Sequence, residues 1–127
     1  MKHVNRCCGG IALLLAMLWG CNAKQGNHGE DLSIFGKNFT YDYNGFKPSV
    51  FYSEADKTVT WHVRNRSETD PIFYKKLGPG RYFVTWKEKD GTVVTQHIDL
   101  VEMKVHSSLL SKSGRLHLME GKINRQK

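Results

Sequence analysis

The stretch from residue 80 to residue 99 constrains the fold more than any other part of the sequence. It reads GRYFVTWKEKDGTVVTQHID, and apolar and polar side chains alternate on both sides of Asp90-Gly91. This pattern predicts a β-hairpin, because glycine adopts the positive φ that a tight turn requires. Residues two apart lie on the same side of a strand. One face of this hairpin therefore carries Tyr82, Val84, Trp86, Glu88, Val94, Gln96 and Ile98.

Glu88 and Gln96 are polar residues on an otherwise apolar face of this hairpin. Such a face is either a poorly buried edge or the wall of a ligand cavity. If it is a cavity wall, a buried amide at Gln96 is expected to pair with the Glu88 carboxyl group. The functional interpretation depends on this choice.

Similar alternating segments recur along the rest of the chain. With the two arms of the hairpin, they predict eight strands at a spacing of about ten residues, which is typical of an all-β barrel or sandwich. Eight antiparallel strands that close into a barrel enclose just enough room for side chains or one small ligand. The other predicted strands cover residues 39–43, 49–52, 58–63, 72–77, 104–110 and 116–123, with turn signals at Asn44-Gly45 and a polar connection at 64–70.

The first twenty residues have the features of an export signal. Lys2 and Arg6 precede an uncharged apolar run that is too short to span a bilayer. The run ends in Leu-Trp-Gly-Cys21, which resembles the lipobox of bacterial lipoproteins, although Trp19 stands where that motif usually has a small residue. The alternative is an ordinary secretory signal with an incidental cysteine. The resemblance implies lipidation of Cys21, and Asn22 after it favours the outer membrane, facing the periplasm.

These features divide the chain into a signal peptide (1–20), a lipidated cysteine with a flexible tether (21–34) and a β-barrel domain (35–127). The other two cysteines lie in the signal peptide, so the mature domain has no thiol for a disulfide or a thiolate metal site.

The basic charge is spread along the mature chain. Of the 19 lysines and arginines, 17 follow the signal peptide, against 12 acids, which gives about +5. This distribution indicates a solvated basic surface near an anionic membrane; a nucleic-acid site would need a clustered stripe and conflicts with export. No metal or cofactor is expected, because the histidines show no metal-ligand spacing and no phosphate loop is present. The histidines considered are His62, His97, His106 and His117.

Two sequence blocks carry a resemblance to a known family. They are GKNFTYDYNG (36–45) and GRYFVTWKEKDGT (80–92), followed by Asp99 and a final Leu-Met-Glu-Gly at 118–121. In this order they resemble the MoaF-like family, which is similar in fold to the phenolic acid decarboxylases and, more distantly, to the lipocalins. The resemblance covers residues 35 to about 123. It implies a small calycin-like barrel with an open interior, whereas MoaF-like proteins have no well-defined reaction.

The resemblance to the decarboxylases concerns three positions. Their paired tyrosines match Tyr41 and Tyr43, which would bind a substrate carboxylate, and their glutamate matches Glu88, which would handle the phenol end or its proton. Those enzymes also need an arginine between the Thr-Trp strand and the hairpin, and they have a long C-terminal extension. Arg64 and Arg66 lie nearby but match no motif, and the extension is absent.

We therefore expect a lipid-anchored protein of the bacterial envelope whose calycin-like barrel binds a small amphipathic or aromatic ligand without catalysis. This hypothesis fails if the barrel interior is solidly filled. The alternatives are an enzyme of the phenolic acid decarboxylase type and a periplasmic inhibitor or interaction protein, and the oligomeric state stays open. The candidate cavity residues are Tyr41, Tyr43, Trp61, Trp86, Glu88 and Gln96.

Overall fold

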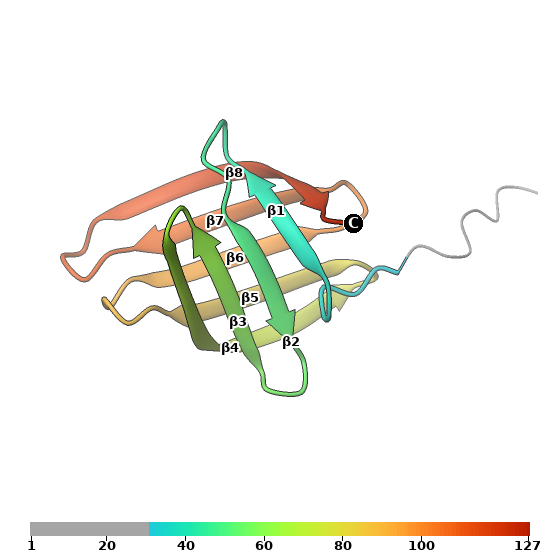
Figure 1. Cartoon of the computed structure of the whole chain (residues 1–127), viewed down its shortest axis with the longest axis horizontal. Helices are drawn as coiled ribbons and strands as arrows, with labels where there is room; N and C mark the ends of the chain where they lie inside the picture. Colours follow the sequence, from blue (N-terminus) through green and yellow to red (C-terminus); the bar gives the residue numbers. More distant parts are fainter. Residues whose placement is uncertain (1–30) are drawn as a thin grey trace, which may run out of the picture. The chain divides into compact units, whose positions relative to one another are not determined.

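The computed structural model describes residues 31–127, which contain eight antiparallel strands in sequence order (Figure 1). β1 pairs with β8 and closes the barrel. The all-β prediction and the eight-strand meander are confirmed. The predicted signal peptide (1–20), Cys21 and most of the predicted tether lie outside the described residues. The strands are β1 (Asn38–Asp42), β2 (Ser49–Ser53), β3 (Thr58–Val63), β4 (Arg66–Gly78), β5 (Arg81–Lys87), β6 (Val93–Asp99), β7 (Lys104–Leu110) and β8 (Leu116–Arg125).

Two long strands, β4 and β8, make the corners of the barrel. Residues 66–71 of β4 pair with β3 and residues 72–78 pair with β5. In the same way β8 pairs first with β7 and then with β1. Because β4 and β8 each pair with one neighbour along their first part and with the other along the rest, β1 to β3 cross in front of β5 to β7 in Figure 1.

The prediction that residues 64–70 form a connection is wrong from Arg66 onward. This segment is a strand with an unusual burial pattern, in which the inward position Asp70 is polar and most of its neighbours are exposed. The alternation of polarity that marks most strands is missing here, because the inward side chains are polar as well.

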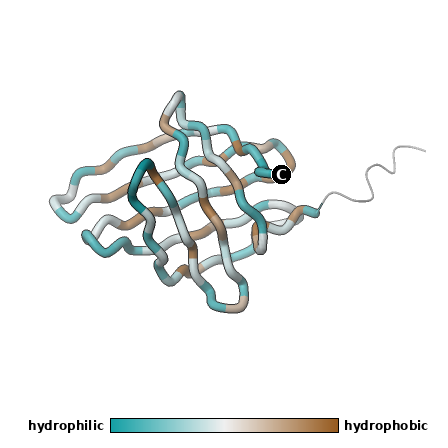
Figure 2. Tube along the Cα trace, in the orientation of Figure 1, coloured by the Kyte–Doolittle hydropathy of each residue, from teal (hydrophilic) through white to brown (hydrophobic). Residues whose placement is uncertain are grey.

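Side-chain burial alternates along the other strands. In β6 the buried positions are Val94, Gln96 and Ile98, and in β5 they are Tyr82, Val84 and Trp86. Figure 2 shows the same alternation of hydrophilic and hydrophobic residues along the tube. The predicted inward face of the hairpin is therefore confirmed, and Glu88 continues it just beyond the end of β5 as a half-buried residue.

Both predicted hairpin turns are present. At the first, Asn44 and Gly45 have φ of 59° and 102°, and the Tyr43 N–H donates to the Phe46 carbonyl at 2.9 Å. Two consecutive positive φ values characterise the type I′ turn that matches strand twist. At the second, Gly91 has a φ of 94° within a longer connection between Lys87 and Val93.

One end of the barrel is closed by the segment before β1. Ile34 is fully buried, and the Phe35 ring lies edge-on to Tyr74 and Tyr82, at centroid distances of 4.8 and 6.0 Å. The compact unit begins at Leu32, so residues 32–34, which the sequence assigned to the tether, pack with the barrel. None of the residues from 31 onward belongs to a helix long and apolar enough to cross a membrane.

Candidate functional site

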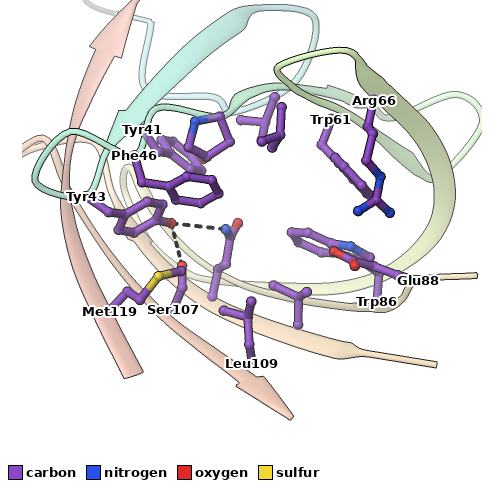
Figure 3. A pocket seen from close by; sticks show the side chains of 15 residues that line it. Tyr41, Tyr43, Phe46, Trp61, Arg66, Trp86, Glu88, Ser107, Leu109 and Met119 are labelled. Atoms are coloured by element: carbon purple, nitrogen blue, oxygen red, sulfur yellow. Dashed lines mark hydrogen bonds between the residues drawn. The ribbon is translucent and has the colours of Figure 1, made fainter. Parts of the chain in front are cut away.

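A cavity of about 280 Å³ occupies the other end of the barrel (Figure 3). The interior is therefore not solidly filled. All six candidate residues named from the sequence line this cavity. Nine further residues complete its wall; they are Phe46, Pro48, Val50, Val63, Arg66, Val94, Ser107, Leu109 and Met119.

A chain of hydrogen bonds between buried side chains forms the floor of the cavity. The Tyr52 hydroxyl donates to Gln96 Oε1 at 2.7 Å, so the 2.9 Å contact between Tyr41 and Tyr52 has Tyr41 as its donor. Gln96 Nε2 donates to the Tyr43 hydroxyl at 3.5 Å, and that hydroxyl is 2.6 Å from Ser107 Oγ. Figure 3 shows the last two bonds. The floor network thus joins five side chains, four from β1, β2, β6 and β7 and the fifth, Tyr43, from the residue that follows β1.

The expected pairing of Gln96 with Glu88 is wrong. Gln96 lies opposite Val84 in the ladder, whereas Glu88 lies beyond the Trp86–Val94 pair. Glu88 is four residues further along than Val84, which corresponds to about 13 Å along a strand. Gln96 instead satisfies its amide with tyrosine hydroxyls. Tyr52 and Ser107, which complete the network, were not singled out from the sequence, because neither belongs to a motif with known chemistry.

The three tyrosines of the floor network remain neutral. Burial raises the pKa of Tyr41 and of Tyr52 well above that of a free phenol, and burial also raises the pKa of Tyr43 to about 12 despite its bond to Ser107. Their hydroxyls therefore act as hydrogen-bonding groups and not as bases near neutral pH.

A glycine fixes the position of Tyr43. A Cβ atom at Gly121 would lie 2.7 Å from Tyr43 Cδ1, so the ring can rest against β8 only because residue 121 has no side chain. This close approach brings the Tyr43 hydroxyl to Ser107 on β7. It gives a physical reason for glycine at the end of the Leu-Met-Glu-Gly segment.

Two tryptophans in the cavity wall differ in whether their indole N–H has a hydrogen-bond partner. Trp61 and Trp86 are both buried, at 7% and 5% exposure. Trp61 Nε1 donates to Asp70 Oδ2 at 3.2 Å, whereas Trp86 Nε1 is the one buried side-chain polar atom without a partner among the described residues. Burial raises the pKa of Asp70, and the bond from Trp61 opposes that rise.

The two charged residues that line the cavity are Arg66 and Glu88. In Figure 3 the Arg66 side chain reaches into the cavity, and its guanidinium carbon is 5.7 Å from the centre of the Trp61 ring. Burial, helped by neighbouring acids, raises the pKa of Glu88 to about 7, while Arg66 lowers it. Arg66 was not predicted as a site residue. In a strand that covers residues 66–72, Arg66 lies on the same face as Asp70 and Ile72. Recognising this strand in the sequence would therefore have placed Arg66 on the inward face.

The described part of the chain offers no group of three or more acidic, histidine or cysteine side chains that could hold a metal ion. The lining of the cavity provides aromatic and aliphatic surfaces, hydroxyls, one amide and one pair of opposite charges.

Comparison with known proteins agrees with this architecture. A crystal structure of a "putative beta-lactamase" from Burkholderia vietnamiensis has a similar fold, with a TM-score of 0.69 and 16% identity, over 73% of this chain and 95% of that one. At this identity the likeness shows the fold alone. No curated protein matches the sequence. The sequence profile of the MoaF-like family matches residues 35–124, which is nearly all of the barrel. The chain therefore belongs to the MoaF-like family.

Proposed function

We propose that the barrel binds a small amphipathic molecule in this cavity. The observation that carries the proposal is the cavity itself, which has aromatic walls, a hydrogen-bonded floor and one pair of charged residues. Small-molecule sites are usually concave and mostly apolar, with a few placed polar groups that fix orientation. At about 280 Å³ the volume suits a ligand with one aromatic ring and a short chain.

The arrangement of the wall suggests how such a ligand lies. Its apolar body packs against the rings of Phe46, Trp61 and Trp86, where aromatic contacts stabilise it. Its polar end lies near Arg66 and Glu88, the charged residues of the wall. The floor network is internally satisfied, so it gives the cavity a rigid base.

The alternative, an enzyme of the phenolic acid decarboxylase type, is supported by Arg66 and weakened by the hydrogen bonds of Tyr41 and Tyr43. Arg66 supplies a cation in the cavity, which the motif comparison lacked. However, Tyr41 is fully buried and donates to Tyr52, and the Tyr43 hydroxyl is engaged with Ser107 and Gln96. The two tyrosines would have to leave these bonds to hold a substrate carboxylate. Binding without catalysis is therefore the function that the geometry supports better.

Membrane anchoring through Cys21 is part of the proposal and rests on the lipobox resemblance alone. In a bacterial host, labelled palmitate should be incorporated into the wild-type protein and not into Cys21→Ser. The wild type should also fractionate with the envelope, most of it with the outer membrane. Release of unlabelled protein into the periplasm would contradict the anchor and leave the cavity proposal intact.

Ligand binding is tested with the full-length protein in mild detergent. Native mass spectrometry should detect a co-purified small molecule, and titration with 4-phenylbutan-1-ol should change the fluorescence of Trp61 and Trp86. Leu109→Trp places a large ring in the cavity wall and should abolish binding. The matched control is Leu110→Trp at the next residue, which is 42% exposed and lies outside the cavity wall. Equal binding by both variants would place the ligand elsewhere and contradict the proposal.

A further inference from the structure

Acidic side chains are prominent around Glu88, although the chain as a whole is basic. The chain has a formal net charge of +7. The charged groups that act most strongly on Glu88 or on its neighbour Asp70 are three acids and two bases. The acids are Glu68, Asp70 and Asp90, and the bases are Arg66 and Lys89. With Glu88 ionised, this cluster has an excess of negative charge.

The three neighbouring acids each have a hydrogen-bond partner within the protein. Glu68 Oε1 accepts from the Lys89 backbone N–H at 2.8 Å, and Asp90 Oδ1 accepts from the Thr92 N–H at 2.8 Å. Asp70 accepts from Trp61. Within residues 31–127, the carboxyl group of Glu88 makes neither a hydrogen bond nor an ion pair shorter than 4 Å. Of these four acids, Glu88 is the one that lines the cavity, and its carboxyl group has no partner within the described residues.

Arg66 already places a cation among the aromatic rings of the cavity. Its guanidinium stands over the Trp61 ring at 5.7 Å, which is cation–π distance. No ion pair within 4 Å joins it to any carboxylate of the described residues. The residue as a whole is exposed, so its side chain can turn out to solvent. The face of the Trp61 ring is thus a position that accepts a cation. The Arg66 side chain can leave this position.

We propose that the ligand of this cavity is an amphipathic organic cation, an aryl-alkyl amine or guanidine, whose charged group replaces the Arg66 guanidinium over Trp61 and pairs with Glu88. This inference rests on the proposed binding function. A cationic head group offsets the excess of acids and gives Glu88 a partner. An anion would meet the repulsion of these acids, and a neutral ligand would leave Glu88 without a partner.

The ionisation of Glu88 makes this binding depend on pH. Its pKa of about 7 reflects burial together with Asp90, Glu68 and Asp70, opposed by Arg66. A cation binds the ionised form more tightly. Affinity should therefore rise with pH by up to about tenfold in total as Glu88 ionises around pH 7, and level off above that range. An aliphatic amine stays protonated throughout this range, since its pKa is about 10.4.

Three probes with the same tail separate this inference from the proposed function. They are 4-phenylbutylamine, 4-phenylbutan-1-ol and 4-phenylbutanoate, titrated by calorimetry against the full-length protein at pH 6 and pH 8. The amine should bind about tenfold more tightly than the alcohol at pH 8, and the acid most weakly. Equal or tighter binding of the alcohol or the acid would overturn the cation assignment while supporting the cavity. Failure of all three to bind would overturn both.

Two variants give opposite expected effects on amine binding. Glu88→Gln should lose about tenfold in amine affinity together with the pH dependence, and it should leave the alcohol unaffected. Arg66→Gln removes the competing internal cation and should raise amine affinity about fivefold at pH 9, where Glu88 is ionised. The control Arg64→Gln removes an equal charge from an exposed residue outside the cavity and should change little. Loss of amine affinity in Arg66→Gln would contradict the proposal.

Discussion

The two ends of the barrel are built from the same strands but packed differently. β6 contributes Ile98 to the closed end, where Ile34 and Phe35 fill the interior, and contributes Val94 to the cavity wall at the open end. At the closed end the inward side chains of Ile34 and Ile98 are fully buried in the hydrophobic core. At the open end the inward side chains surround empty volume, and Asp70 brings a carboxylate inward. We therefore expect the closed end to contribute more to stability than the open end, which contains the cavity.

The floor network separates the two ends. Gln96 lies between Val94 and Ile98 on β6, and its amide is bonded to Tyr52 of β2 and to Tyr43, which follows β1. A fully satisfied buried network is rigid, whereas the loss of one member leaves costly unpaired groups. The network therefore keeps the cavity open without leaving polar groups unsatisfied beneath it.

The largest expected difference between the ends concerns truncation of an inward aliphatic side chain. Ile98→Ala at the closed end should lower the free energy of unfolding by about 3 kcal/mol, because the space left there cannot collapse. Leu109→Ala at the open end should cost about 1 kcal/mol, since that side chain is only partly buried and borders the cavity. Urea denaturation with an unchanged m-value measures both. Equal losses would show that both ends contribute alike to stability.

A smaller effect is expected where the floor network meets β8. Gly121→Ala places a Cβ atom against the Tyr43 ring and should cost about 2 kcal/mol through overpacking. The displaced ring should also weaken the bond between Tyr43 and Ser107, so probe binding should fall with stability. Gly114→Ala is a useful contrast, because nothing lies near its Cβ position and only its positive φ opposes the change. A Gly121 variant with wild-type probe affinity would show that Tyr43 does not shape the cavity.

The two tryptophans test whether the open end tolerates unpaired polar groups. Trp61→Phe removes the donor to Asp70 and leaves a buried carboxylate unpaired, so it should cost about 1–3 kcal/mol beyond the lost ring area. Trp86→Phe removes an indole N–H that has no partner, so only the ring area is lost. Thermal unfolding at pH 7 compares them directly. If Trp86→Phe proves the more damaging change, the unpaired nitrogen has a partner that the structure does not include, such as a ligand.

Much of this architecture follows from local sequence patterns. Alternation around Asp90-Gly91 and the turn at Asn44-Gly45 predict the hairpins, and the inward face of β5 and β6 follows from the two-residue period. The same reasoning names six residues that line the cavity, because aromatic and polar side chains in the same phase are typical of a cavity wall.

Two features of the site do not follow from local patterns: the inward place of Arg66 and the partners of Gln96. Arg66 was overlooked because the first half of β4 is polar in both phases and resembles a loop. The partners of Gln96 could not be derived, since the register of β6 against β7 and the approach of β1 and β2 depend on closure of the whole barrel. Binary patterns thus predict faces, while contacts across the barrel require the three-dimensional arrangement.

The smallest expected difference between the ends is in their response to pH. At the open end the Glu88 pKa is raised from 4.5 to about 7, so the folded protein binds more protons than the unfolded chain between these values, and stability falls as pH rises through them. The free energy of unfolding of Glu88→Gln should therefore exceed that of the wild type by about 1 kcal/mol at pH 8 and equal it at pH 4. The value at pH 8 is reduced from the full shift because the side chain is half exposed.

At the closed end the pKa of Asp99 shifts in the opposite direction. Burial opposes its ionisation, but bonds from the N–H groups of Glu102 and Val101 prevail and lower its pKa below 3.8. The contribution of the ionised Asp99 to stability is present above pH 3.8 and is lost as the pH falls through the pKa of Asp99 in the folded state. Asp99→Asn should therefore destabilise the protein at pH 7 and have less effect near pH 2. Unfolding measured from pH 2 to pH 8 should give opposite slopes for the two variants relative to wild type, and parallel slopes would show that the two carboxyl groups lie in equivalent environments.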